Sequence, residues 1–442
     1  MNLPNIYLTG IRDVDDLLLD FLTIHCVINM TRINKSIYCV LKSSLTYHEL
    51  VALKHYKLTD KLNFCSKFGN LKIIRLYRHD IDNVSINKLV HIASESGQLN
   101  ILMYLVSLGA DITALGNDAV SASRNGHLDV VKYLVALDTS VIADNNALRL
   151  ASEYGHLDVV KYLISLGNDI TADDNIAVRH ASCNGHLDVV KYLVSMGADI
   201  QAEENYAVQC ASRYGHLDVV KYLVSVGADF RADNNYAIQC ASNYGHIDVV
   251  KYLVSLGSDC TAQDNDAIQY ASSYGHLDVV KYLVSVGADP NANDNYAIRG
   301  ASTNGHLDTV KYLVSLGGDP TTQENYAIRA ASQYGHLDTV KYLVSVGANP
   351  TAKSNYPVRL ASQNGHLEVV KYLISLAADP TSHDNHAVRL AAEYGHLEVV
   401  KFLVSVGADP TASNNYAVFF ALENSHLDVF EYLVSLGADY SG

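Results

Sequence analysis

The chain has 442 residues, of which 49% are hydrophobic and 18% are charged, a composition typical of a protein that folds around a core. Its 47 acidic and 32 basic residues give a net charge of -15, which disfavours nucleic acid as a ligand. The seven cysteines show no CxxC pair, and no apolar run approaches the roughly 18 residues of a membrane span, so we expect an intracellular protein without membrane attachment.

The first 57 residues do not repeat and have a hydrophobic pattern of their own, which predicts two or three short helices. The stretch DFLTIHCVINMTRINKSIY resembles the F-box, with Phe21, Ile28 and Ile33 at places where that family has large apolar residues. The resemblance implies docking on a Skp-type adaptor of a cullin RING ubiquitin ligase. The expected apolar anchors are Leu18, Phe21, Leu22, Ile28, Ile33 and Ile37.

A second interpretation of residues 1–57 stays open. A stacked array has an apolar end that needs a cover, and these helices would then only cap the first repeat. Under the F-box interpretation the chain is a substrate receptor of a ubiquitin ligase. Under the cap interpretation it is a plain binding or sequestering scaffold.

An internal repeat dominates the rest of the chain. The string GHLDVVKYL returns with a strict period of 30 residues from His156 to His426. Upstream the pattern continues at His127 and then, in degenerate form, at Gln98 and Asn70. Residues 58–442 are therefore expected to form an array of about thirteen stacked repeats, the first two degenerate.

One repeat, residues 201–230, predicts two helices joined by a turn. Small apolar residues after Asn205 indicate a short first helix that Asn205 caps and Gly215 ends. A second, amphipathic helix follows and ends at Gly227. Its apolar face is expected to consist of Leu217, Val220, Leu223 and Val224. Because two short helices cannot bury their apolar faces alone, the repeats must share one continuous core, which predicts an all-α solenoid.

The repeat resembles the ankyrin repeat, whose pattern runs TPLHxAAxxGHLEVVKLLLxxGAD. The segment GHLDVVKYLVSxGAD matches the second half nearly position for position, and Pro357 lies at the family proline. Two departures stand out, because Tyr and Arg or Gln replace the Thr and His of TPLH, and the period is 30 where the family has about 33. We expect shorter β-hairpin fingers, or turns alone.

This 30-residue variant, rich in Tyr and Asn, resembles the ankyrin proteins of giant amoeba-infecting DNA viruses. The resemblance implies a viral protein that acts inside a host cell, in the cytoplasm or the nucleus.

Catalysis is not expected. The histidine of each GH pair occurs once per repeat, and packed helices lie about 8–10 Å apart, so these histidines form a row and not a metal cluster. We interpret them as structural residues at the start of the second helix. Motifs for phosphate binding, zinc hydrolysis or nucleophilic catalysis are absent from the sequence, which predicts neither an enzyme nor a cofactor.

Partner binding is expected where the repeats differ, since ankyrin arrays usually bind on the first helices and loop tips. The two positions after the Ala-Ser pair vary most and often hold Tyr, a residue that gives a large contact area at low entropic cost. With acidic loop tips, this pattern suits a partner bearing a basic patch; a freely varying solvated face is the alternative. The candidate residues are Arg213, Tyr214, Asn243, Tyr244, Ser273, Tyr274, Gln333, Tyr334, Glu203 and Glu204.

The last repeat is atypical, as a terminal repeat should be. Glu431 suits a polar cap, whereas Phe419 and Phe420 do not, and they suggest a contact site or a dimer surface.

Overall fold

The computed structural model describes residues 58–439 except 82, 112–114, 139 and 141–144. Compactness divides the chain into a first part, Met1–Asp199, and a second part, Ile200–Gly442. The described residues contain helices and turns but no strand, which confirms the all-α solenoid; of the two expected forms of the connection, shorter β-hairpin fingers or turns alone, they show turns.

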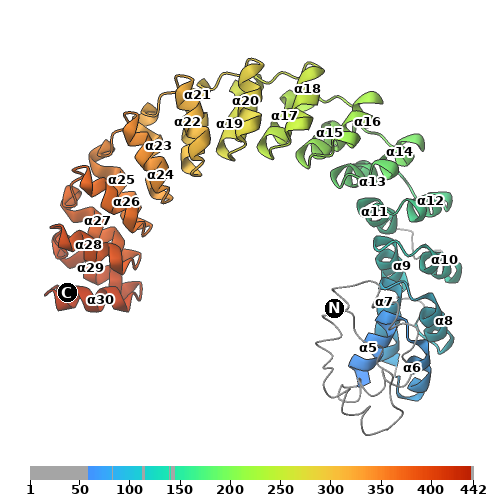
Figure 1. The fold of residues 1–442 in the computed structure, drawn as a ribbon. Coiled ribbons are helices and arrows are strands. Elements are labelled where there is room, and N and C mark those ends of the chain that lie inside the picture. Colours follow the sequence, from blue (N-terminus) through green and yellow to red (C-terminus); the bar gives the residue numbers. More distant parts are fainter. Residues whose placement is uncertain (1–57, 82, 112–114, 139, 141–144, 440–442) are drawn as a thin grey trace, which may run out of the picture. The chain divides into compact units, whose positions relative to one another are not determined.

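Thirteen helix pairs follow one another along the described residues, each made of a first and a second helix (Figure 1). The first part contains α5 (Leu58–Phe68), α6 (Leu71–Leu76), the 3-10 helix η1 (Arg78–Asp80), α7 (Asn83–Glu95), α8 (Leu99–Ser107), α9 (Leu115–Arg124), α10 (Leu128–Leu137), α11 (Asn146–Glu153), α12 (Leu157–Ser165), α13 (Ala172–Cys183) and α14 (Leu187–Ser195).

The second part contains eight of these pairs. They are α15 (Ala202–Arg213), α16 (Leu217–Ser225), α17 (Ala232–Asn243), α18 (Ile247–Ser255), α19 (Ala262–Ser273), α20 (Leu277–Ser285), α21 (Ala292–Thr303), α22 (Leu307–Ser315), α23 (Thr322–Gln333), α24 (Leu337–Ser345), α25 (Ala352–Gln363), α26 (Leu367–Ser375), α27 (Ser382–Glu393), α28 (Leu397–Ser405), α29 (Ala412–Glu423) and α30 (Leu427–Ser435).

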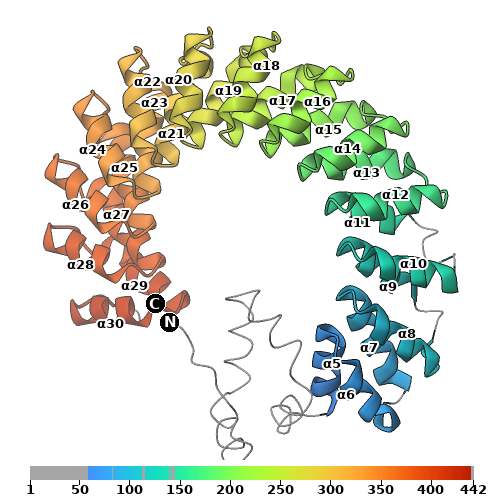
Figure 2. The ribbon, with the colours of Figure 1, turned by 45° about the vertical axis from the view of Figure 1, so that its right-hand side comes forward.

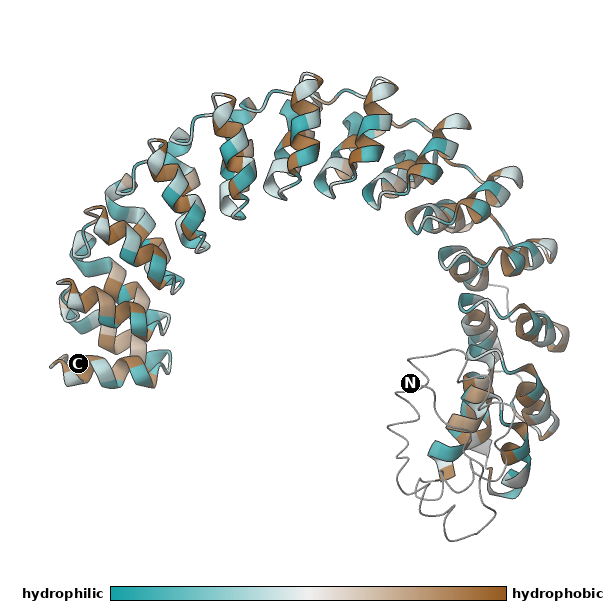
Figure 3. Cartoon of the chain, viewed as in Figure 1, coloured by the Kyte–Doolittle hydropathy of each residue, from teal (hydrophilic) through white to brown (hydrophobic). Residues whose placement is uncertain are grey.

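The helices of the second part lie in two rows. First helices such as α17, α19 and α21 pack on one another, and each also packs on its own second helix (Figures 1 and 2). Helices such as α17, α19 and α21 carry apolar bands beside hydrophilic ones, as helices buried on one side do (Figure 3). The core is therefore a strip that runs along the row of repeats.

The core of a repeat is small and recurs with little change. In α16, Val219, Val220 and Leu223 are fully buried, whereas Leu217 and Val224 of the predicted face are only half-buried. Val219 is buried although it lies outside the predicted face. Each such side chain contributes about 1.5–3 kcal/mol when fully buried. In α15, Ala211 and Ser212 are also completely buried, because neighbouring first helices approach closely.

Each first helix of the second part begins with a left-handed turn. In α15 the dihedral φ is 51° at Glu203, 55° at Glu204 and 65° at Asn205, and right-handed helix follows. The same three positions are left-handed in every first helix from α13 to α29. A left-handed residue other than glycine costs about 1–2 kcal/mol, so this turn needs support from the rest of the repeat.

Side-chain hydrogen bonds supply that support. Asn205 Oδ1 accepts a hydrogen bond of 2.7 Å from the backbone N–H of Asp229, in the loop that follows the second helix. The prediction that Asn205 caps the first helix is therefore wrong, because its side chain bonds to that loop and not to the helix N-terminus. Gln209 also donates 2.8 Å to the carbonyl of Glu204 inside the turn.

From His127 onwards, a histidine at the start of the second helix joins a repeat to the one before it. His366 Nε2 donates a hydrogen bond of 2.9 Å to the carbonyl of Gln333, and the ring lies against Gly335. A Cβ atom at Gly335 would come within 2.5 Å of His366 Nδ1, so this glycine provides both a positive φ and room for the next histidine. The bond recurs in both parts, from His127, His156, His186, His246, His276, His336 and His396.

Candidate protein-binding surface

Tyrosines at the ends of the first helices form an exposed row, here called the tyrosine column. Tyr214, Tyr244, Tyr274 and Tyr334 are the residues that follow α15, α17, α19 and α23. Their exposed fractions are 51%, 41%, 58% and 53%. All four tyrosines predicted from the sequence are thus accessible to a partner.

Arg213 ties two members of the column together. Its Nη2 and Nε atoms donate hydrogen bonds of 2.6 and 3.0 Å to the hydroxyl of Tyr244, and its guanidinium lies 5.0 Å from the centre of that ring. The rings of Tyr214 and Tyr244 are 6.4 Å apart. The hydrogen bond to Tyr244 raises the pKa of Arg213 further, so the group stays charged. This contact fixes the orientation of the Tyr244 ring, which lowers the entropic cost of binding.

The other predicted residues of the column are less available. Asn243, Ser273 and Gln333 are half-buried, and their carbonyls accept the hydrogen bonds from the histidines of the next repeat. The Ser273 hydroxyl also donates to the carbonyl of Gln269 at 2.9 Å. The side chain at these positions varies between repeats because the histidines bond only to the backbone carbonyl, which every residue has.

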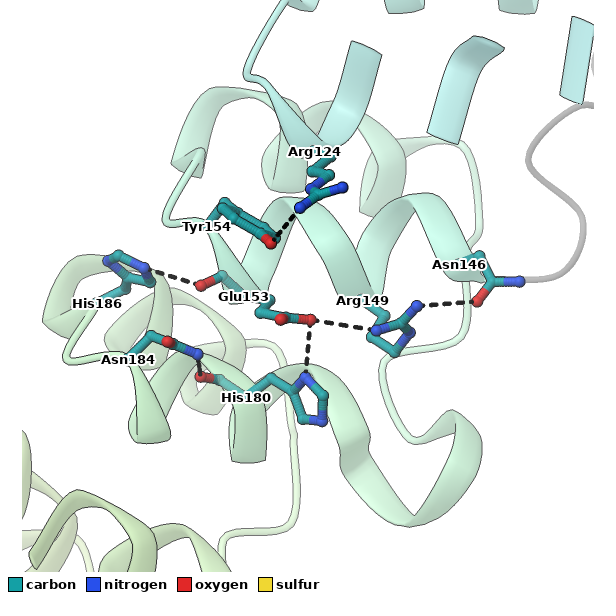
Figure 4. A network of polar contacts seen from close by, with 8 residues as sticks. All are labelled: Arg124, Asn146, Arg149, Glu153, Tyr154, His180, Asn184 and His186. Carbon is teal, nitrogen blue, oxygen red and sulfur yellow. Dashed lines mark hydrogen bonds and ion pairs between the residues drawn. The ribbon is translucent and has the colours of Figure 1, made fainter. Parts of the chain in front are cut away.

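In the first part, Glu153 occupies the position equivalent to Arg213, and its polar groups bond to other residues of the array (Figure 4). The carboxylate of Glu153 lies between Arg149 Nη1, at 3.2 Å, and His180 Nδ1, at 3.0 Å. Its carbonyl accepts a 3.0 Å bond from His186. The neighbouring Tyr154 hydroxyl accepts a 2.8 Å bond from Arg124, much as Tyr244 does from Arg213. An arginine held on the tyrosine of the following repeat therefore occurs in both parts of the chain.

The loop tips, the first two left-handed residues of each turn, fall into two groups in the second part. Glu203, Glu204, Asp233 and Asp264 are exposed, and none of them forms an ion pair within the described residues. From residue 294 onwards the tips instead bond to one another between repeats. The pairs are Gln323 to Asp294 at 2.7 Å, Lys353 with Glu324, and Ser413 with Asp384.

An arginine–tyrosine row, which the sequence did not suggest, lies on the first helices from α21 to α25. Arg299 lies 5.1 Å from the ring of Tyr296 and 5.5 Å from that of Tyr326, in the next repeat. Arg329 is placed likewise, 5.5 Å from Tyr326 and 5.7 Å from Tyr356. Arg299 also donates 2.9 Å to the carbonyl of Asn293 in its own left-handed turn. The spacing Tyr-x-x-Arg was visible in the sequence, but the contact across repeats was not.

The three preceding repeats have a neutral glutamine at the position of these arginines. The residues are Gln209, Gln239 and Gln269. First helices α15, α17 and α19 therefore carry tyrosines and unpaired acidic tips, with Arg213 on α15 held on the Tyr244 hydroxyl. Helices α21 to α25 carry arginines, and most of their tips are paired. The two halves of this surface thus differ in charge.

The row of histidines has a definite protonation state. Because a carbonyl only accepts, each Nε2 atom must carry a proton, and the neutral ring is sufficient. Burial lowers the pKa of His306 and His366, and the neighbouring histidines lower it further. These rings serve as structural links between repeats. The described residues contain no group of three His, Cys, Asp or Glu side chains that could hold a metal ion.

The predicted adaptor anchors between Leu18 and Ile37 lie outside the described residues. Among the helices that the structure does describe, none is long and apolar enough to cross a bilayer.

A family model described as ankyrin repeats in three copies matches the chain over residues 90–174, 119–204, 148–234, 206–294, 295–384 and 358–441. Taken together, these matches cover residues 90–441 without a gap. The match agrees with the helix pairs and with the stacking described above. No curated protein matches the chain.

Proposed function

The chain belongs to the ankyrin-repeat proteins, and we propose that it binds a protein partner carrying a patch of Lys and Arg through first helices α15, α17 and α19. Ankyrin repeats indicate a protein–protein interaction scaffold. The proposal concerns the chemistry of the partner and the part of the array that holds it.

The observation that carries the proposal is a concentration of exposed aromatic and acidic groups over three neighbouring repeats. Each of the three repeats contributes two tyrosines that are at least 38% exposed: Tyr206, Tyr214, Tyr236, Tyr244, Tyr270 and Tyr274. Tyrosine faces attract Lys and Arg cations, and aromatic residues are enriched where interfaces are strongest. The unpaired Glu203, Glu204, Asp233 and Asp264 add negative charge that would steer a basic partner.

A capture experiment with the full chain tests this proposal. Proteins bound to the tagged chain in cells are crosslinked and identified by mass spectrometry for the wild type and for a Tyr214→Ser, Tyr274→Ser variant. We expect a partner that is lost with this variant, that loses affinity in Glu203→Gln, Glu204→Gln, and whose crosslinked segment contains Lys or Arg. Tyr394→Ser is the matched control, since Tyr394 is 48% exposed at the same position of a repeat outside this surface.

Two outcomes would contradict the proposal. One is a partner whose binding is equally reduced by the control variant. The other is a partner that is insensitive to both the tyrosine and the glutamate substitutions, which would place the contact elsewhere on the array.

Recruitment of a Skp-type adaptor through residues 1–57 remains a second proposal, and its support is the F-box-like sequence around Phe21 and Ile33 alone. Binding of the purified adaptor to the full chain, compared with a Phe21→Ala, Ile33→Ala variant, tests it. Loss of adaptor binding in the variant would support a substrate receptor for a ubiquitin ligase. No binding by the wild type would leave residues 1–57 as a cap. Viral origin and action in a host cell also remain predictions.

A further inference from the structure

The outer face of the last helix pair differs from the faces between repeats. At the position of Leu422, the preceding repeats have small residues such as Ser362, which is fully buried against its neighbour. Leu422 is larger and 42% exposed. Phe419 stands where other repeats have Arg or Gln, and it is 54% exposed. These residues with Leu427, which is 58% exposed, are here called the apolar end face.

A further repeat of the same kind does not fit on this face. In the preceding repeat, Gly395 leaves room for His426, because a Cβ atom there would come within 2.4 Å of Nδ1. Ser425 takes the place of that glycine in the last repeat, so its Cβ atom would collide with the histidine of a following repeat. Leu422 would likewise fill the space that a neighbouring first helix occupies elsewhere. The face therefore has a shape of its own.

The surroundings of the apolar end face are acidic. Glu423, Asp428 and Glu431 are exposed around it, and Glu431 replaces the Lys found in the other repeats of this series. The sequence has no Lys or Arg after Lys401. A second copy joined through the same face would bring these carboxylates together, which costs free energy. An apolar centre with an acidic rim instead matches an apolar helix face bordered by basic residues.

We propose that the apolar end face binds an amphipathic helix of a partner protein, whose apolar side is flanked by Lys and Arg. The helix would pack its apolar side on Phe419, Leu422 and Leu427 of α29 and α30, in a position different from that of a neighbouring repeat, with its cations near Glu423 and Glu431. This site is separate from the tyrosine surface of α15, α17 and α19. Its success or failure is therefore independent of the function proposed above.

The test uses the full chain and two synthetic helical peptides of about five turns with the same leucine face, one bordered by Lys and one by Glu. Binding is followed by fluorescence anisotropy at physiological salt. We expect the Lys-bordered peptide to bind at least about tenfold more tightly than the Glu-bordered peptide. Phe419→Ser, Leu427→Ser should weaken it by about tenfold or more, since exposed apolar anchors dominate such contacts. Glu423→Gln, Glu431→Gln should weaken it less.

The control variant is Leu316→Ser, which removes a side chain 37% exposed after α22, outside both proposed surfaces, and should bind the Lys-bordered peptide as the wild type does. Circular dichroism verifies that all variants keep their helix content, as expected for exposed positions. Three results would overturn the proposal. They are equal binding of the two peptides, binding that the end-face variant does not reduce, and a wild-type dimer that Phe419→Ser, Leu427→Ser converts to a monomer.

Discussion

Two glycines of one repeat allow the link between repeats to be measured. Gly335 and Gly347 both have positive φ, 79° and 103°. An alanine Cβ at Gly335 would come within 2.5 Å of His366, whereas at Gly347 no atom lies within 4 Å. The chain already tolerates alanine at the second type of position, where Ala377 has a φ of 67°. At the position equivalent to Gly335, every repeat has glycine except the last, which has Ser425.

The expected costs differ accordingly. Gly347→Ala carries only the left-handed penalty of about 1–2 kcal/mol. Gly335→Ala carries the same penalty and also displaces His366. The hydrogen bond to the Gln333 carbonyl is then lost and that carbonyl has no donor, which adds about 1–3 kcal/mol to the left-handed penalty. The difference corresponds to about 5- to 150-fold in the equilibrium for local opening.

Hydrogen exchange of the full chain measures this difference, because a long repeat array does not unfold in one step. Exchange followed by mass spectrometry gives the free energy of local opening for α24 and α26 in each variant. We expect protection to fall modestly in Gly347→Ala and much further in Gly335→Ala. Adding His366→Ala to Gly335→Ala should recover part of the loss, since the clash is then removed. Equal losses in the two single variants would refute the reasoning.

Three other predictions concern the same contacts. Burial holds the folded pKa of His366 and His306 below the unfolded value, so their contribution to stability is complete above about pH 6.5 and falls as the pH drops below it. Protection of α22 and α26, corrected for the intrinsic pH dependence of exchange, should therefore be lower at about pH 5.5 than at about 7.5, and unchanged or higher protection would contradict this. Asn325→Ala removes the acceptor for the Asn349 N–H and should destabilise α23 by about 1–3 kcal/mol in hydrogen exchange, with Asn325→Asp as a milder control. Ser354→Gly should stabilise α25 by about 0.5–1 kcal/mol and Ser354→Val should destabilise it, as measured by the same exchange, because φ at Ser354 is 54°; stabilisation by both would be inconsistent with a left-handed turn.

The sequence was enough to predict the helix pairs. The recurrence every 30 residues defines the repeats, and the apolar spacing of GHLDVVKYL within each repeat indicates its second helix. The left-handed turn was not predicted. Its third residue is always Asn, which favours that conformation, and Asp233 and Asn234 do so at the first two positions, but residues such as Glu204 or Lys353 at the same positions do not. The turn exists because hydrogen bonds from distant residues hold it, and such bonds are not visible in a local pattern.

For the candidate surface too, features of single residues could be predicted, whereas contacts between repeats could not. Exposure of Tyr214 and Tyr274 could be predicted, since a large polar-tipped residue at a variable position is commonly exposed. The sequence predicted acidic loop tips that suit a basic partner, but the pairs from Asp294 onwards connect residues 29 positions apart. A single sequence gives no sign that two variable positions depend on one another, so the acidic tips of α15 to α19 could not be distinguished from the paired ones.

The link between histidine and glycine also bears on how the length of this chain can change over generations. Every interior repeat of the second part has the same two contact residues. One is a histidine that bonds to the preceding repeat, and the other is a glycine that leaves room for the histidine of the next repeat. Loss of residues 246–275 would bring His276 to Arg213 and Gly215, where His246 lies now. Unequal recombination between the similar gene segments could therefore remove or add whole repeats while every remaining histidine finds its glycine. Ser425 marks the one repeat that such an exchange cannot move into the interior.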